Sequence, residues 1–467
     1  PDQHDKPRFF PSPGTGHPFR RLTDSFRAYL PAVIPARDIL AAMRPLLLGP
    51  LTAIAAALFT TCGTREPHNA PPHDRLRPGP WRMELDLRTS TDPGPVILPF
   101  TFEVITNSIR NQALRIHNGA EAIDVDELRI DGDSIRVHMP LFDSEFIGQL
   151  HGDTAFSGKW FNYLKGPTYS IPFAAKAGRA PRFPGQADGH ERVAGTWACH
   201  FAPGTPDAYD AVGLFEATAD RVTGTFGTET GDHRFLEGGM RADSFLLSSF
   251  DGSHAYLFRA LLRNDSLVGE FRSGIHSVEH WQAVRDPDFQ LRDPDSLTFL
   301  KEGYDMVDIR LPNLNGDTIS LMDARFNGRV RMVQIMGSWC PNCMDESRLL
   351  AQMHERYHAS GLDVVAVAFE READPLRAVE MLKRYQRRLH IPYDILYAGS
   401  SNKESVAEKL PFLDHLMSYP TCIFIDRMGK VRRIRTGFYG PSTGLHYRNY
   451  QHNLEQFLER MLAEPAP

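Results

Sequence analysis

The sequence contains few cysteines, little net charge and no long uninterrupted apolar run. Five cysteines among 467 residues fit an oxidising compartment in which thiols are used sparingly. The formal net charge of −6, without a basic run that has interleaved aromatics, argues against nucleic-acid binding. The length is sufficient for about two to four domains.

The chain has a single CxxC motif, Trp-Cys-Pro-Asn-Cys at residues 339–343, between a predicted strand at 329–336 and a predicted helix at 344–358. Two thiols three residues apart at a helix start can close into a small disulfide ring. Backbone N–H groups and the helix dipole stabilise a thiolate there, so we expect Cys340 to be an exposed, acidic nucleophile. Cys343, one turn further on, can attack a mixed disulfide that Cys340 forms. The motif predicts a thiol–disulfide oxidoreductase.

A structural zinc site is the main alternative for a CxxC motif. Zinc needs two further Cys or His ligands at short spacing, and the sequence has no second CxxC. His354 and His358 lie about three and four turns along the predicted helix, out of reach of the cysteines. The sequence therefore predicts no metal and no other cofactor at this site.

A proline far downstream supports the same chemistry. Tyr419 and Pro420 precede a strand-like run at 422–426. In thioredoxin folds a cis-proline before a central strand lies beside the CxxC motif, and the residue before it offers backbone hydrogen bonds to the substrate chain. The alternative is an ordinary trans proline that opens a strand. The upstream motif favours a cis bond here.

From about residue 307 to its end, the chain resembles the TlpA/ResA group of bacterial envelope thioredoxin-like proteins. The resemblance also rests on four further segments, which are residues 308–316, 319–321, 361–368 and 426–430. It implies reduction of substrate disulfides, in cytochrome c maturation or in repair of metal-site thiols. It implies a substrate groove that is formed by Trp339, Pro341, Tyr419 and Pro420. Pro-Asn between the cysteines departs from the group and leaves the direction of the reaction open.

The family's buried carboxylate maps onto Glu346, three residues after Cys343. Residues at i and i+3 share a helix face, so Glu346 could take and return the proton of the inner thiol. Asp345 is the rival residue for this role, and a solvated helix acid is the structural alternative.

Two other activities on related folds fit the motif less well. Peroxiredoxins place Thr or Ser three residues before their reactive cysteine, where this chain has Gly337. Envelope copper chaperones space their cysteines CxxxC and use a distant His. Both differences favour disulfide exchange.

The N-terminal residues resemble a bacterial lipoprotein signal. Arg44 precedes an apolar stretch, too short to span a bilayer comfortably and interrupted by prolines, that ends at Cys62 before a polar tail. We expect residues 1–62 to be an upstream segment with a signal peptide that starts at Met43, Cys62 to carry the lipid, and residues 63–78 to be a linker. Simple secretion with a spare thiol is the alternative. The remaining cysteines, Cys199 and Cys422, are predicted to be buried and inert.

Residues 80–288 show short alternating runs that are separated by turn signals, which is typical of antiparallel β structure. Motifs recur at offsets of about 108–116 residues, for example Gly-Pro-Trp at 79–81 and Gly-Thr-Trp at 195–197. We therefore expect two related β modules, each a small barrel or sandwich, or two halves of one larger barrel. Their ranges are 79–173 and 186–288, with a dividing linker at 174–185, and a thioredoxin-like α/β domain follows at 297–467.

These patterns together predict a multidomain, lipid-anchored protein of the cell envelope that faces the periplasm. Its expected partners are cysteine-containing envelope proteins and an upstream electron donor at the membrane. The alternative function is a ligand- or partner-binding lipoprotein in which the β modules carry the main task and the dithiol senses redox state.

Overall fold

The computed structural model describes residues 75–106, 111–185 and 189–466. The predicted signal peptide, Cys62 and residues 63–74 of the predicted linker at 63–78 lie outside the described residues. Among the described helices, none combines the length and the apolar character that crossing a bilayer requires.

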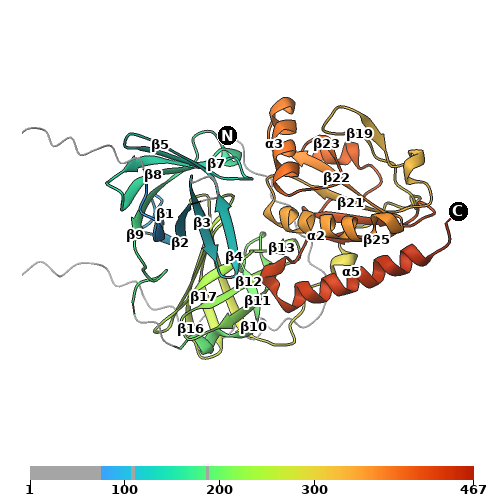
Figure 1. The fold of residues 1–467 in the computed structure, drawn as a ribbon. Coiled ribbons are helices and arrows are strands. Elements are labelled where there is room, and N and C mark those ends of the chain that lie inside the picture. The colour runs from blue at the N-terminus through green and yellow to red at the C-terminus, as the bar shows by residue number, and fades with distance from the viewer. Residues whose placement is uncertain (1–74, 107–110, 186–188, 467) are drawn as a thin grey trace, which may run out of the picture. The chain divides into compact units, whose positions relative to one another are not determined.

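The first β module is one nine-stranded antiparallel sheet (Figure 1). Its strands follow the order β4-β3-β2-β1-β9-β8-β7-β6-β5, so β1 pairs with both β2 and β9. Alternate side chains of β1, including Trp81, Met83 and Leu85, are buried, as the period of two predicts. The strands are β1 Gly79–Asp86, β2 Ile97–Thr106, β3 Gln112–Asn118, β4 Glu121–Val125, β5 Glu127–Asp131, β6 Ser134–His138, β7 Ser144–Leu150, β8 Ala155–Asn162 and β9 Ser170–Ala177.

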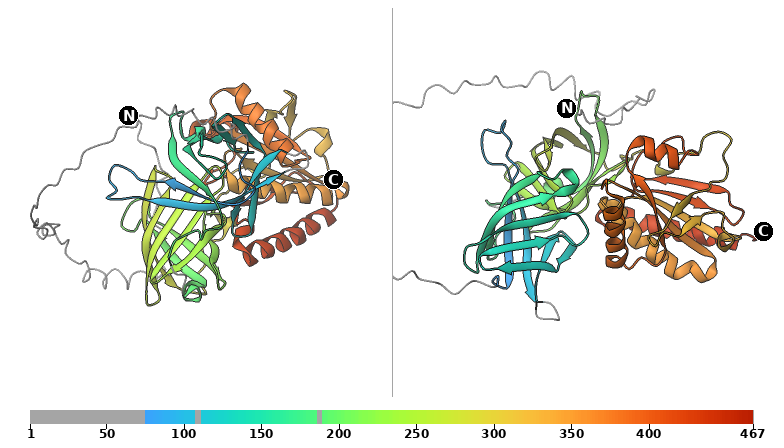
Figure 2. Two further views of the ribbon diagram at one scale, coloured as in Figure 1. Left: turned by 60° about the vertical axis from the view of Figure 1, so that its left-hand side comes forward. Right: turned by 90° about the horizontal axis from the view of Figure 1, so that it is seen from above.

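The second β module is a closed barrel, visible in the green to yellow strands of Figure 2. Its order is β11-β10-β18-β17-β16-β15-β14-β12-β13, and β11 also pairs with β12, which closes the ring. The strands are β10 Gly195–Phe201, β11 Tyr209–Ala217, β12 Val222–Thr228, β13 Gly231–Asp232, β14 Leu236–Arg241, β15 Ser244–Phe250, β16 Ala255–Arg263, β17 Ser266–Ser273 and β18 Ser277–Arg285.

The internal repeat that the sequence predicts is present at atomic level. Gly79 and Gly195 open β1 and β10 with the same φ of 109°. The indole N–H of Trp81 donates to the backbone oxygen four residues earlier at 2.8 Å, and that of Trp197 does the same at 2.9 Å. Both rings are buried. Each module therefore begins with the same anchored tryptophan.

The two modules share core and hydrogen bonds, and the predicted linker does not separate them. Phe250 of the second module lies in the core of the first, where its ring stacks on Phe100 with centroids 4.6 Å apart. The side-chain amide of Asn118 donates to the Phe250 carbonyl at 2.9 Å. Residues 174–177 of the predicted linker belong to β9, and Arg182 further along is buried, donating to the His117 carbonyl at 2.6 Å. The segment predicted as a dividing linker is therefore not a separate tether, because Ala175, Arg182 and Phe183 within it are buried.

The C-terminal domain has a five-stranded sheet of order β23-β22-β21-β24-β25, with β21, β22 and β23 parallel and the other two antiparallel. A short hairpin, β19 Arg310–Pro312 and β20 Thr318–Ser320, precedes it. The active-site helix begins at Pro341, three residues before the predicted start. The elements are β21 Val330–Met336, α2 Pro341–Tyr357, β22 Leu362–Glu370, α3 Pro375–Arg388, β23 Asp394–Ser400, α4 Lys403–Lys409, β24 Thr421–Ile425, β25 Val431–Thr436 and α5 Leu445–Ala463.

Apolar side chains cover both faces of this sheet. One face packs against α2, α3 and α5, and the other against the hairpin and α4. Both faces of β21 are buried, and its residues are accordingly apolar except for Arg331 and Gln334. This arrangement, with the CxxC motif between β21 and α2, is thioredoxin-like.

We predict that two glycines at matching places in the repeats are needed for close strand packing. A methyl group on Gly158 or Gly269 would overlap the carbonyl oxygen of Ile147 or Arg259, respectively, on the neighbouring strand. Gly269→Ala and Gly158→Ala should each lower the free energy of unfolding by about 1–3 kcal/mol in a denaturant titration. Gly94→Ala, where a methyl group meets nothing within 4 Å, should change it by less than about 0.5 kcal/mol. Equal stability of all three variants would contradict this packing.

Candidate active site

Cys340 and Cys343 form a disulfide at the start of α2. Cys340 is the N-cap residue of the helix, and its Sγ accepts a hydrogen bond from the backbone N–H of Cys343 at 3.2 Å. The helix N-terminus therefore directs a donor and its positive dipole end at this sulfur. The same geometry would stabilise a thiolate after reduction.

The cysteines are less accessible than the sequence predicts. Cys340 is 6% exposed and Cys343 is fully buried. The expectation of an exposed Cys340 was wrong, because the second β module contacts the residues between the cysteines. The Asn342 side-chain amide donates to the Asp232 carbonyl at 3.1 Å, and Arg234 donates to the Pro341 carbonyl at 3.1 Å.

The predicted groove residues surround the disulfide. The Tyr419–Pro420 peptide bond is cis, as predicted, and the Tyr419 carbonyl oxygen lies 3.5 Å from the Cys340 sulfur. The rings of Trp339 and Tyr419 pack edge to face, with centroids 5.2 Å apart. The Trp339 indole donates to the Phe369 carbonyl at 3.0 Å, which fixes the ring beside the motif. All of the residues predicted for the groove thus lie at one place.

Glu346 is a buried carboxylic acid one turn below Cys343, as the sequence predicts. The Gln334 side-chain amide donates to Glu346 Oε2 at 2.9 Å and to the Cys343 carbonyl at 3.2 Å, so one side chain joins the acid to the inner cysteine. Burial raises the pKa of Glu346 to about 7, and the hydrogen bond from Gln334 opposes that rise. A group with this pKa can both accept and return a proton near neutral pH.

Asp345, the rival carboxylate, points elsewhere. It pairs with Arg234 of the second β module and, at 3.2 Å, with Arg348 on its own helix. Burial raises the pKa of Asp345 to about 6, and the Arg234 guanidinium opposes that rise. The Asp345 carboxylate therefore already has two arginine partners, which favours Glu346 over Asp345 as the candidate for proton transfer.

Glu370 is a second buried acid beside the motif, and the sequence motifs did not predict it. It accepts hydrogen bonds from the backbone N–H and the hydroxyl of Ser338, both at 2.8 Å, in the turn before the CxxC motif. Burial raises its pKa to about 7, and the Ser338 bonds oppose the rise. The segment 361–368, on which the resemblance partly rests, stops two residues before β22 ends at Glu370. The available signal was an acid at the end of an apolar strand.

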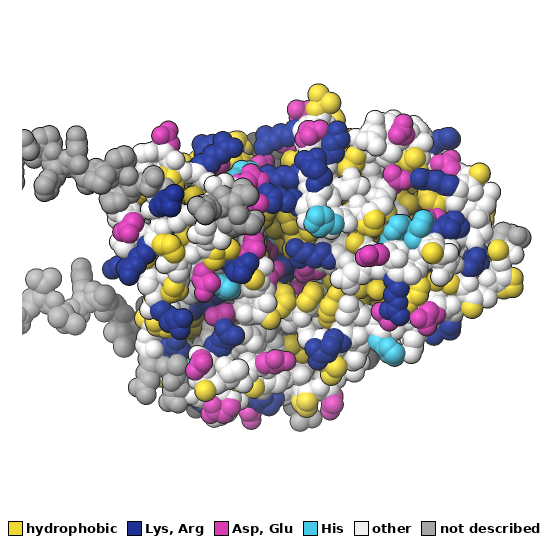
Figure 3. Space-filling view, viewed as in Figure 1, with side chains coloured by type: hydrophobic (Ala, Val, Ile, Leu, Met, Phe, Trp, Pro, Cys, Tyr) yellow, Lys and Arg dark blue, Asp and Glu magenta, His cyan; other side chains and the backbone are white. Residues whose placement is uncertain are grey.

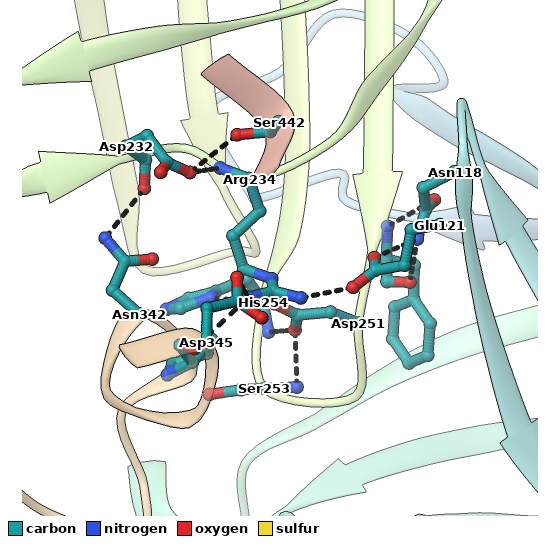
Figure 4. A network of polar contacts seen from close by, with 12 residues as sticks. Asn118, Glu121, Asp232, Arg234, Asp251, Ser253, His254, Asn342, Asp345 and Ser442 are labelled. Carbon is teal, nitrogen blue, oxygen red and sulfur yellow. Dashed lines mark hydrogen bonds and ion pairs between the residues drawn. The ribbon is translucent and has the colours of Figure 1, made fainter. Parts of the chain in front are cut away.

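Arg234 is the other residue that was missed, and it joins all three parts of the protein (Figure 4). Its guanidinium is 2% exposed and pairs with Glu121 of β4, Asp251 of the second module and Asp345 of α2. Burial lowers the pKa of Arg234, but the surrounding carboxylates outweigh burial and raise it above its usual value. An arginine remains charged in such a site.

Exposed ion pairs continue this contact between α3 and the first module. Arg388 binds Asp126 at 2.8 Å, and Arg384 binds Glu127 at 2.8 Å. In the space-filling view, Lys and Arg side chains lie beside Asp and Glu where these parts meet (Figure 3). Each exposed ion pair contributes only about 0–1 kcal/mol to stability. The buried contacts of Arg234 therefore do more to fix how the C-terminal domain packs against the β modules.

One group of side chains in the described residues has metal-ligand spacing. His354, His358 and Asp363 offer ligand atoms within 4.8 Å of one another. The Arg329 guanidinium binds Asp363 at 2.6 Å, so a positive charge already occupies this carboxylate. The group does not fit a metal ion. Cys199 and Cys422 are buried free thiols, as predicted, and burial raises the pKa of both.

Comparisons with known proteins bear on the C-terminal domain. The model of the AhpC/TSA family matches residues 303–434, from before β19 into β25. Similar solved structures include a putative thiol:disulfide interchange protein DsbE from Chlorobium tepidum, with 24% identity over 35% of this chain and 100% of that chain, at a TM-score of 0.28. A secreted thiol-disulfide isomerase from Corynebacterium glutamicum has 19% identity over 38% of this chain and 98% of that chain, at a TM-score of 0.29. No curated protein matches the chain.

The raised pKa of Glu346 predicts how stability depends on pH. Its folded pKa of about 7 exceeds the ordinary 4.5, so the stabilisation from protonated Glu346 is complete below about pH 4.5 and is lost as the pH rises through 7. Glu346→Gln should match the parent within about 1 kcal/mol at low pH. Above pH 7 it should be more stable, by up to about 3 kcal/mol.

Unfolding of the oxidised protein at pH 5 and pH 8 measures this difference. Glu355→Gln, on an exposed position of α2, is the matched control and should follow the parent at both values. A parent-like pH dependence in Glu346→Gln would show that folding does not raise the pKa of this acid.

Proposed function

We propose that the protein is a membrane-anchored thiol–disulfide oxidoreductase of the TlpA/ResA type that reduces disulfides of envelope proteins. The observation that carries the proposal is the Cys340–Cys343 disulfide at the start of α2 beside the cis Tyr419–Pro420 bond. A dithiol at a helix N-terminus suits disulfide exchange, since one sulfur is activated and the other is held ready to resolve.

The reaction begins with both cysteines reduced. The Cys340 thiolate attacks one sulfur of a substrate disulfide, a new sulfur–sulfur bond forms, and the substrate's own bond breaks. The leaving substrate thiolate takes a proton. Cys343 then loses its proton and attacks Cys340, which closes the protein disulfide and releases the second substrate thiol. The substrate gains two electrons and two protons, and a dithiol donor restores the enzyme.

Glu346 handles the proton in the second half of this reaction. Cys343 is fully buried, so water cannot readily take its proton. Gln334 holds Glu346 in the same hydrogen-bonded unit as the Cys343 backbone. The acid accepts the proton during resolution and returns it when the disulfide is reduced again. Trp339, Pro341, Tyr419 and Pro420 shape the groove for the substrate chain, with the Tyr419 carbonyl as its hydrogen-bond acceptor.

A peroxidase is the alternative function on this scaffold. A hydroxyl three residues before the reactive cysteine would stand at Gly337, where a Cβ atom would lie 2.7 Å from the Phe369 carbonyl oxygen. This position therefore has no room for Thr or Ser, which favours disulfide exchange.

Replacing the resolving cysteine should stop the reaction halfway. With a chromogenic aryl disulfide, the reduced parent should release two thiolate equivalents, while Cys343→Ser should release one and keep the other half as an adduct on Cys340. Cys340→Ser should release none, and Cys422→Ser should match the parent because this thiol is buried. The release is followed by absorbance and the adduct by mass spectrometry.

Release of both equivalents by Cys343→Ser would contradict the assigned roles. Consumption of hydrogen peroxide faster than of disulfide by the parent would favour the peroxidase instead.

The proposed location rests on the lipoprotein-like sequence that ends at Cys62. Expressed from Met43, the protein should partition into detergent and incorporate labelled fatty acid, because acylation at Cys62 supplies the anchor. Cys62→Ala should remain unprocessed or become soluble, while Cys199→Ala serves as the cysteine control. Unchanged membrane fractionation of Cys62→Ala would rule out the lipid anchor, and the protein would then be a simple secreted one.

A further inference from the structure

A small cavity lies over Cys340, and all three parts of the protein line it. Its volume is about 220 Å³, and Lys165 of the first module, His254 of the second and Arg371 of the C-terminal domain contribute to its wall. Pockets for drug-sized ligands are larger, roughly 300–1,000 Å³. A cavity of this size suits a cysteine with its immediate neighbours on a short or flexible chain.

The charged groups in this wall are mainly cationic. The Lys165 ammonium lies 3.1 Å from the His276 ring nitrogen, and the Arg371 guanidinium lies 3.7 Å from the centroid of the Trp339 ring. Among the described residues, neither cation has a carboxylate within ion-pair distance, whereas most arginines at the module boundary do. Burial lowers the pKa of Lys165 to about 8, with Arg371 adding to the effect, so the amine is still mostly protonated at neutral pH.

The acids near the cavity are already paired. Asp232 lines it, but its carboxylate accepts from the backbone N–H of Arg234 at 2.6 Å and from the Ser442 hydroxyl at 3.0 Å. Asp251, behind His254, pairs with Arg234 at 3.5 Å. Lys165 and Arg371, the two cations of the wall without a carboxylate partner among the described residues, therefore remain available to a ligand.

We propose that the redox site selects substrates in which the reacting cysteine is flanked by a carboxylate on a short or flexible chain. The inference rests on the proposed disulfide exchange at Cys340. Lys165 and Arg371 bind the carboxylate while the Tyr419 carbonyl binds the substrate backbone and Cys340 forms the mixed disulfide. Two cations in the wall of one cavity attract a carboxylate more strongly than a single cation on an open surface does. A small anionic peptide and an acidic tail of a larger protein share this chemistry.

The test compares three small disulfides with the reduced full-length protein. The probes are oxidised glutathione, which is anionic, hydroxyethyl disulfide, which is neutral, and cystamine, which is cationic. Each rate is divided by the rate of the same disulfide with free dithiothreitol, which removes intrinsic reactivity. We expect the normalised rate to be highest for the anionic disulfide, lower for the neutral one and lowest for the cationic one. The ratio of the anionic to the neutral rate should fall as salt rises from about 0.01 to 0.5 M, because salt screens the attraction.

Substitutions locate the effect. Lys165→Gln should lower the ratio of anionic to neutral rates about tenfold, the loss of one contact of about 1.4 kcal/mol. Arg371→Gln should act in the same direction. Lys159→Gln, an exposed lysine on β8 outside the cavity, removes the same charge and should leave the ratio unchanged.

Two failures are distinguishable. If the normalised rates of all three disulfides are equal, and Lys165→Gln and Lys159→Gln give the same ratio, the selectivity is overturned. The proposed disulfide exchange then still stands. Reduction of none of them would overturn the proposed function. Peptides with Asp or Lys beside a cystine, free or placed in the tail of a folded protein, separate the two sources: preference for Asp in either context supports the proposal, and preference in neither overturns it.

Discussion

The ion pairs of one buried arginine hold the redox motif against the β modules. Arg234 binds Glu121, Asp251 and Asp345 and donates to the Pro341 carbonyl, so it touches the first module, the second module and the active-site helix. Removing one partner of a buried charge pair costs about 3–5 kcal/mol, because the remaining charge stays buried without compensation. The position of the CxxC motif therefore depends on a side chain more than a hundred residues earlier in the chain.

This arrangement places residues of both β modules around the CxxC motif. In an isolated thioredoxin-like domain, the sulfur at the helix start would face solvent. Here the second module covers Pro341 and Asn342, and the first module adds Lys165 to the wall of the cavity over Cys340. Access to the sulfur and the charge around it are thus properties of the whole described chain, while the proposed exchange reaction belongs to the thioredoxin-like part.

Sequence reasoning was most successful where the signal is local. The spacing of Cys340 and Cys343, the cis-proline and the inward-facing Glu346 all follow from short motifs, and the two anchored tryptophans follow from a repeated pattern. It failed where distant segments pack together. Arg234 lies in a polar run between strands that resembles an ordinary turn, and only the tertiary structure places it beside Asp345. The burial of Cys340 has the same cause.

The most direct test of this account is the accessibility of reduced Cys340 to thiol reagents of different size. The rates of iodoacetamide and of a maleimide that carries a long polyethylene glycol chain are each normalised to their reaction with a free cysteine peptide. If the β modules enclose the sulfur, the small reagent labels Cys340 readily and the bulky one is strongly slowed. Asn342→Ala, which removes the bond to the Asp232 carbonyl, narrows that difference. Equal normalised rates for both reagents in the parent protein would contradict the account.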